Sequence, residues 1–173
     1  MMTESSAYRS MYPGFQQIAY VTNDVGGAIE RVGKAYDVKN WLRMDDFAFQ
    51  MASGKDVHIE VALANLGGTQ FEIIRPAGGD DAMYRDALPG GSGFEMVFHH
   101  LCKCFDTEAQ FRQHRDYLKQ QGIAMPMDNT ELPSNGIALA LYGDFRETLG
   151  HYLEYVWFTD AGREWTKQIP QNG

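Results

Sequence analysis

The fold is decided by the stretch Phe98-His99-His100-Leu101-Cys102-Lys103-Cys104-Phe105-Asp106, an apolar, strand-like segment with two adjacent histidines and an aspartate before a helix. An earlier stretch, Phe15-Gln16-Gln17-Ile18-Ala19-Tyr20-Val21-Thr22-Asn23-Asp24, follows the same plan, with two amide side chains where the histidines stand. The two stretches therefore look like copies of one unit.

A second pair of stretches continues this match. Gly68-Thr69-Gln70-Phe71-Glu72-Ile73-Ile74-Arg75 aligns with Gly150-His151-Tyr152-Leu153-Glu154-Tyr155-Val156-Trp157, and each has a glutamate at its fifth position. Glu72 follows Gln17 by 55 residues and Glu154 follows His100 by 54, so most of the chain is accounted for by two approximate repeats.

Composition limits the class of protein. The chain has 173 residues, 44% of them apolar, which is enough for a compact core without metal or disulfide support. Its formal charge of -8, with no cluster of Lys and Arg, argues against a nucleic-acid partner. No apolar run reaches the roughly 20 residues that span a bilayer, and the polar start has no signal-peptide pattern, so we expect a cytoplasmic protein. The two cysteines, Cys102 and Cys104, are expected to be reduced thiols.

The pattern of apolar residues and turn signals predicts an α+β fold of two tandem βαβββ modules. The first module is expected to contain strands at 15–22, 40–44, 57–65 and 69–75 and a helix at 25–36. The second is expected to contain strands at 94–105, 123–125, 136–142 and 151–158 and a helix at 107–121. The chain is accordingly divided into an arm (1–13), the first module (14–76), a connector with a short helix at 81–88 (77–93), the second module (94–158) and a C-terminal helix (159–173).

Strand alternation predicts which side chains share a face. His100, Cys102 and Cys104 should face one way, and His99 should face the other and be structural. If a helix covers one face of each sheet, the free face can curve into a cup in a half-barrel. Four side chains would then project into the cup: Gln17, Glu72, His100 and Glu154. Two carboxylates buried together repel each other, and a divalent cation between them would remove this cost.

With these residues in a doubled βαβββ plan, the chain resembles the vicinal oxygen chelate superfamily, which includes glyoxalase I, methylmalonyl-CoA epimerase, extradiol dioxygenases and bleomycin-resistance proteins. The resemblance covers roughly residues 14–158. In that superfamily one residue on the first strand and one on the last strand of each module hold the metal. The matching positions are Gln17 in Gln-Gln-Ile-Ala, Glu72 in Phe-Glu-Ile-Ile, His100 in His-His-Leu-Cys and Glu154 in Leu-Glu-Tyr-Val. Glyoxalase I of the eukaryotic type uses this ligand order, whereas many relatives have His where Gln17 stands.

Three oxygens and one imidazole nitrogen suit Zn²⁺, Ni²⁺, Co²⁺, Mn²⁺ or Fe²⁺, with room for a small substrate that carries two adjacent oxygens. The cation would polarise a carbonyl and stabilise an enediolate, while Glu154 or Glu72 moves the proton as the catalytic base. The sequence thus predicts a metal-dependent lyase or isomerase of glyoxalase type. Arg43, Arg75 and Arg146 are candidates to bind an anionic group of the substrate.

Three alternatives stay open at this level. The first is an epimerase that acts on an acyl-CoA thioester. The second is an extradiol-type Fe(II) dioxygenase, although only His100 and Glu154 of the required two-histidine, one-carboxylate face are in place. The third is a non-catalytic protein that binds a small molecule in the same cup. A homodimer is expected, because modules of this superfamily can also pair across a dimer.

Overall fold

The computed structural model describes residues 14–130 and 136–173, so the expected arm at 1–13 lies outside the described residues. The first half of the chain contains β1 (Phe15–Thr22), α2 (Val25–Tyr36), β2 (Leu42–Gln50), β3 (Asp56–Leu66) and β4 (Thr69–Gly79). The short helix α3 (Ala82–Arg85) follows. The second half contains β5 (Met96–Cys104), α4 (Glu108–Gln120), β6 (Met127–Asp128), β7 (Ala138–Phe145), α5 (Arg146–Leu149) and β8 (His151–Phe158). The tail contains α6 (Asp160–Thr166) and β9 (Gln171–Asn172).

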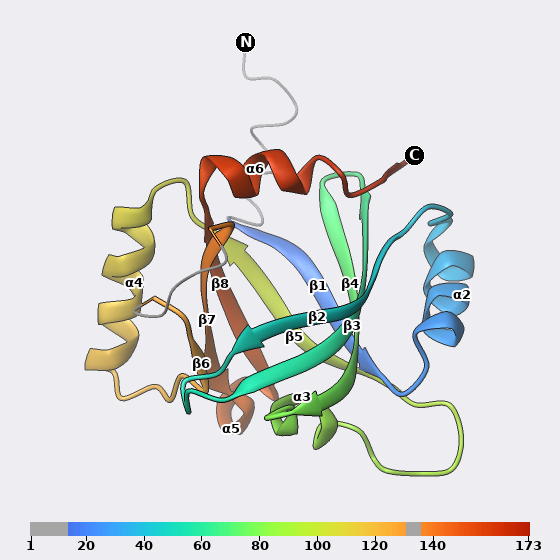
Figure 1. Cartoon of the computed structure of the whole chain (residues 1–173), viewed down its shortest axis with the longest axis horizontal. Helices are drawn as coiled ribbons and strands as arrows, with labels where there is room; N and C mark the ends of the chain where they lie inside the picture. The colour runs from blue at the N-terminus through green and yellow to red at the C-terminus, as the bar shows by residue number, and fades with distance from the viewer. Residues whose placement is uncertain (1–13, 131–135) are drawn as a thin grey trace.

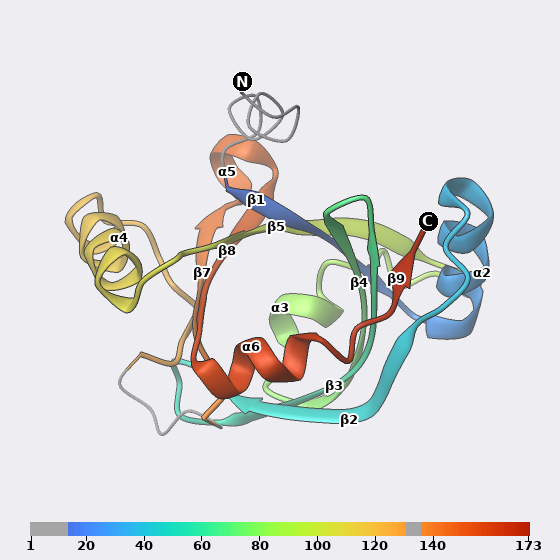
Figure 2. The same cartoon turned by 90° about the horizontal axis from the view of Figure 1, so that it is seen from above.

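The strands form one mixed sheet in the order β2-β3-β4-β1-β5-β8-β7-β6, with β9 added beside β3. Within each half the first and last strands are parallel, and β1 joins β5 in antiparallel pairing at the centre. Figure 2 shows the sheet curving around an interior, with α2 and α4 on its outer side. The predicted α+β half-barrel is confirmed.

The strand register repeats between the two halves. Glu72 lies opposite Ala19 in the β1–β4 ladder, two residues beyond Gln17. In the second half, Glu154 lies opposite Cys102, two residues beyond His100. The two tandem βαβββ modules are therefore confirmed as architecture, while the boundaries 14–76 and 94–158 stay a prediction.

The helix starts follow from capping chemistry. The side chain of Asp24 accepts a hydrogen bond from the backbone amide of Gly27 at the start of α2. Thr107 and Gln110 form a reciprocal capping box at the start of α4. α2 thus begins at the expected residue, and α4 begins one residue after the expected start, with Thr107 as its cap.

Two predicted strands differ most from the structure. Residues 123–125 are not a strand, because Ile123 and Met125 pack against the buried cluster under α4, and pairing with β7 begins only at Met127. The strand expected at 40–44 is β2, which runs on to Gln50 because Phe47 and Phe49 pack against the interior cluster. In both cases tertiary packing determines the extent of the element.

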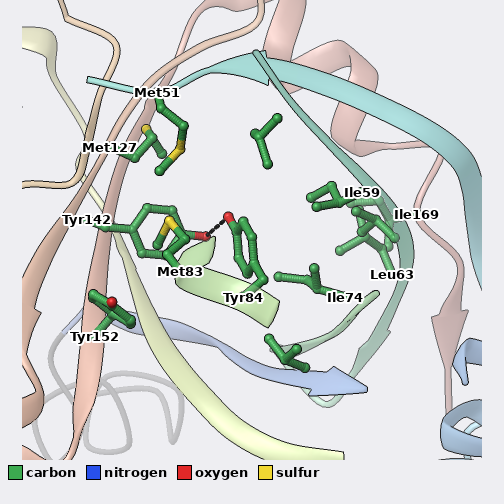
Figure 3. Close-up of a cluster of buried hydrophobic side chains, with 13 residues drawn as sticks. Met51, Ile59, Leu63, Ile74, Met83, Tyr84, Met127, Tyr142, Tyr152 and Ile169 are labelled. Atoms are coloured by element: carbon green, nitrogen blue, oxygen red, sulfur yellow. Dashed lines mark hydrogen bonds between the residues drawn. The ribbon is translucent and has the colours of Figure 1, made fainter. Parts of the chain in front are cut away.

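The interior of the barrel is lined by apolar side chains from both modules (Figure 3). At one end, α3 contributes Met83 and the fully buried Tyr84, whose hydroxyl lies 3.4 Å from that of Tyr142. At the opposite end lies α6, and the tail that follows it contributes the buried Ile169 (Figures 1 and 2). The connector and the tail therefore complete the core. No described helix is long and apolar enough to cross a membrane.

The tail is fastened to the first module by Asn172. Its side-chain oxygen accepts hydrogen bonds from the backbone amides of Lys39 and Asn40, each at 2.9 Å, and its amide nitrogen donates to the carbonyls of Asn40 and Asn65. The residue is buried, so these four bonds have no competition from water. The tail thus spans from β8 of the second module to β3 of the first.

Replacing Asn172 with Ala should lower the free energy of unfolding by about 2–3 kcal/mol, because several backbone groups lose their partners in a buried place. Urea denaturation measures this change. Gln171→Ala, an exposed neighbour in the same strand, serves as the control and should change it by less than about 0.5 kcal/mol. Equal effects of the two substitutions would show that Asn172 does not fasten the tail.

Candidate metal centre

Glu72, His100 and Glu154 meet on the inner wall of the barrel. They come from β4, β5 and β8, and one ligand atom of each lies within 4.8 Å of the others. The Nε2 atom of His100 lies 3.2 Å from a carboxylate oxygen of Glu72 and 3.3 Å from one of Glu154. The imidazole is completely buried and each carboxylate is only 14% exposed. Three of the four predicted ligands are therefore brought together.

Gln17 is buried in β1 and lines the same cavity as the two glutamates. Its amide nitrogen donates a hydrogen bond of 2.8 Å to the side-chain oxygen of Gln70, and the amide of Gln70 in turn donates to Asn65. These two hydrogen bonds orient the Gln17 amide. Its nitrogen is engaged with Gln70, and its oxygen, Oε1, remains available as an acceptor. The place of Gln17 in a metal site stays a proposal.

Three buried polar atoms in this region make no well-directed hydrogen bond among the described residues, although two of them, Glu72 Oε2 and His100 Nε2, face each other at 3.2 Å. They are Gln17 Oε1, Glu72 Oε2 and His100 Nε2. Leaving buried polar atoms unsatisfied is costly, and native structures rarely do so without a bound ion or water. All three atoms are good ligands for a divalent cation of the transition series, so the side chains present fit such an ion.

The charges of the three side chains are strongly coupled. Burial raises the pKa of Glu72; His100 opposes that rise and the charge of Glu154 adds to it. Burial alone would lower the pKa of His100, but the two glutamates outweigh it and raise that pKa to about 9. A proton and a cation therefore compete for the same place between the carboxylates.

His99 does not face away from His100, and the prediction that it does was wrong. The β1–β5 ladder pairs Ala19 with His100 but Tyr20 with Phe98, so His99 is an extra residue in a β-bulge. The bulge breaks the alternation, and the Nδ1 atoms of the two histidines lie 2.9 Å apart. His99 is buried, and its Nε2 lies 3.0 Å from the carbonyl oxygen of Met83 in α3.

The candidate centre opens into a cavity of about 900 Å³. Its walls are mostly apolar and include Met44, Phe47, Ile59, Tyr142 and Phe158. A cavity of this size holds a substrate of some tens of atoms, in contact mainly with hydrocarbon and aromatic surface.

None of the predicted anion-binding arginines lines this cavity. Arg43, Arg75 and Arg146 lie elsewhere, and the last two are paired with carboxylates on neighbouring strand residues. The cavity is instead lined by Arg163 and Lys167 from the tail. Sequence reasoning missed them because only the path of the tail over the barrel brings them to the cavity.

Cys102 and Cys104 are free thiols that also line the cavity. Burial raises the pKa of the Cys102 thiol, so it stays protonated. Neither cysteine belongs to the group formed by Glu72, His100 and Glu154. Cys102 therefore acts as a small wall residue next to Glu154.

Neither the models of known protein families nor the curated proteins match this chain. Solved structures do match. A Streptomyces coelicolor methylmalonyl-CoA epimerase in complex with 2-nitronate-propionyl-CoA is 14% identical, with a TM-score of 0.54 over 85% of this chain and 95% of that chain. The chain shares its fold with this methylmalonyl-CoA epimerase, as its resemblance to the vicinal oxygen chelate superfamily implies.

Further matches agree with this vicinal oxygen chelate fold. The methylmalonyl-CoA epimerase of Mycobacterium tuberculosis is 14% identical, with a TM-score of 0.52 over 87% of this chain and 91% of that chain. A methylmalonyl-CoA epimerase in complex with methylmalonyl-CoA and ammonium is 16% identical, with a TM-score of 0.52 over 85% of this chain and 95% of that chain. At such identities the likeness concerns the fold, and function has to be argued from the site.

The wild-type protein should bind one divalent ion per chain, and His100→Ala and Glu72→Ala should each weaken binding by at least about 100-fold, because each removes a ligand. Competition with a coloured chelator, using Zn²⁺ and Ni²⁺, measures the affinities. Asp106→Asn, which changes an exposed carboxylate at the same cavity, is the control and should leave them unchanged. Equal affinity of wild type and His100→Ala would rule out the centre.

Proposed function

We propose that this protein is a metal-dependent isomerase or lyase that acts on a small substrate with two adjacent oxygens. The observation that carries the proposal is the meeting of Glu72, His100 and Glu154 on the wall of a mainly apolar cavity, where one imidazole faces two buried carboxylates. A protein that only bound an apolar molecule would have no use for two buried glutamates.

In the proposed site, Glu72, His100 and Glu154 hold the cation and Gln17 completes the set through its side-chain oxygen. The donors suit Zn²⁺, Ni²⁺, Co²⁺, Mn²⁺ or Fe²⁺. A cation bound there would act as a Lewis acid that polarises a carbonyl and offsets the negative charge that grows on it when a proton leaves the neighbouring carbon.

The two glutamates are the candidates for moving that proton. They occupy equivalent places in the two modules and approach His100 from β4 and β8, so each can face one side of a substrate. Burial raises the pKa of Glu72 in the metal-free site, the direction that favours a carboxylate as a proton acceptor. Asp106 also lines the cavity but is exposed, so we assign it no role in proton transfer.

A dioxygenase is less well supported. Iron(II) oxygenases of this kind need two histidines and one carboxylate on one face. His100 is the one histidine of the described cluster, and His99 has its two ring nitrogens engaged with His100 and with the carbonyl of Met83. Gln17 and Glu72 stand where a second histidine would be needed.

The choice between a glyoxalase-type lyase and an epimerase depends on the substrate. The ligand order Gln, Glu, His, Glu favours the glyoxalase type, and the solved structures with the same fold favour an epimerase on an acyl thioester. Both reactions begin with the removal of a proton next to a carbonyl, so one experiment addresses both.

The metal-loaded protein is incubated in D₂O with hemithioacetals or with acyl thioesters. In one of these two substrate classes, the hydrogen on the carbon next to the carbonyl should be exchanged for deuterium. NMR or mass spectrometry measures the exchange. Glu154→Gln and Glu72→Gln should slow it by about 100-fold or more, because the base is lost, whereas Asp106→Asn should stay within about threefold. A metal-loaded wild type that exchanges neither class and yet binds apolar ligands would favour the binding-protein alternative.

We further propose that two copies associate through the outer side of β1 and β5, between α2 and α4. Neither α2 nor α4 covers this area, which α5 borders; Phe98 of β5 is 42% exposed and Leu149 of α5 is 56% exposed, an apolar surface suited to a partner. Phe98→Asp should convert a dimer to the 19.5 kDa monomer in analytical ultracentrifugation, and Tyr117→Asp on α4 should not. A monomeric wild type would refute this assembly.

A cytoplasmic location is also part of the proposal, because the two free cysteines suit a reducing compartment. Cell fractionation with an antibody against the protein would test it. Recovery from an oxidising compartment would contradict it.

A further inference from the structure

The neighbourhood of His99 departs from ordinary strand geometry in a way that creates a direct contact with His100. In a regular strand the two side chains would point to opposite faces. Here the bulge inserts His99 between the residues that pair with Ala19 and Tyr20, and both rings lie inside the barrel. Tyr84, Tyr142 and Tyr152 surround the ring of His99, with the Tyr152 centroid at 4.9 Å, so its orientation is held by packing.

The hydrogen-bond partners determine which nitrogen of His99 carries the proton. A carbonyl oxygen can only accept, so the Nε2 atom that lies 3.0 Å from the carbonyl of Met83 must carry hydrogen. If the imidazole is neutral, Nδ1 is then unprotonated and acts as a hydrogen-bond acceptor. His100 faces the two carboxylates, whereas the partners of His99 are tyrosine rings, His100 and the Met83 carbonyl, so an extra proton on the pair belongs to His100 and His99 is the neutral ring.

The same reasoning passes to His100. The Nδ1 atom of His100 lies 2.9 Å from the Nδ1 atom of His99. Because Nδ1 of His99 carries a lone pair, Nδ1 of His100 must donate the hydrogen of this bond. When His100 is neutral, its other nitrogen, Nε2, has no hydrogen. That is the atom placed between Glu72 and Glu154.

We propose that His99 is a positioning residue that accepts a hydrogen bond from His100 and so presents the Nε2 lone pair of His100 to the metal. The Met83 carbonyl in α3 anchors the relay, which makes the connector part of the site. The inference rests on the proposed metal-dependent function and adds to it a residue that never touches the cation.

In the first module the candidate ligand, Gln17, is oriented by a different kind of partner. Gln16, which corresponds to His99 in the repeat, is exposed, whereas Gln17 has its amide oriented by Gln70 on the neighbouring strand. To be oriented as a ligand, His100 needs an acceptor for the hydrogen on Nδ1, and Gln17 needs an acceptor for the hydrogens of its amide nitrogen. Outer partners of this kind typically change metal affinity by about 10–100-fold when they are removed.

The first test reads the proton position directly. In protein labelled with ¹⁵N-histidine, long-range ¹H–¹⁵N spectra at pH 7 should show the hydrogen of His99 on Nε2, with or without Zn²⁺. In the Zn²⁺-loaded protein the hydrogen of His100 should be on Nδ1. A hydrogen on Nδ1 of His99 would overturn the proposal, whatever the protein catalyses.

The second test uses metal affinity. His99→Phe keeps an aromatic ring but has no acceptor, and it should weaken Zn²⁺ and Ni²⁺ binding by about 10–100-fold in competition with a chelator. His99→Gln can accept from His100 and donate to Met83, and it should restore binding to within about fivefold of wild type. Thermal unfolding of the metal-free proteins shows whether either variant merely fails to fold.

The outcomes separate the two proposals. If the wild type binds a cation and His99→Phe binds it equally well, the role of His99 is refuted while the proposed function stands. If His99→Gln binds as weakly as His99→Phe, ring packing rather than hydrogen bonding is responsible, and the inference is again wrong. If the wild type binds no cation, the proposed function fails, and the spectra of the metal-free protein alone then decide the tautomer.

Discussion

The structure depends on the balance of charge among Glu72, His100 and Glu154, which are buried within hydrogen-bonding range of one another in an apolar barrel. Two carboxylates without compensation would not stay ionised there, and one imidazolium can offset only part of their charge. The raised pKa values of Glu72 and His100 express this imbalance. A divalent cation held by the same atoms would supply two positive charges at the place where the carboxylates converge.

The geometry that brings these groups together is a property of the repeat. Antiparallel pairing of β1 with β5 places Gln17 opposite Cys102 and Ala19 opposite His100. Gln17 is equivalent to His100 and Ala19 to Cys102, so the two modules are related by an approximate two-fold symmetry. The parallel pairs then add the glutamates at equivalent distances. A unit that offers two ligands can therefore build a four-ligand site by duplication alone.

Much of the fold and of the candidate site could be predicted from the sequence, because both depend on regular spacing of residues along the chain. The offset between the repeats and the two-residue alternation of strands placed Glu72, His100 and Glu154 on one face, and the structure brings them together. What the sequence did not reveal depends on irregular or distant features. A one-residue bulge turned His99 inward, and no local pattern announces a bulge. The cavity cations Arg163 and Lys167 are set by the course of the tail.

Around the candidate ligands, the two modules differ in the residues that lie behind them. In the first module a side-chain amide, Gln70, orients the ligand candidate Gln17. In the second, a neighbouring ring and a connector carbonyl orient His100. Glutamine and histidine have different donors and acceptors, so the surroundings that suit one cannot serve the other. Once the two modules carry different ligands, their supporting residues must diverge as well. The strand register is irregular at both Gln16 and His99, so this divergence lies in the side chains rather than in the backbone.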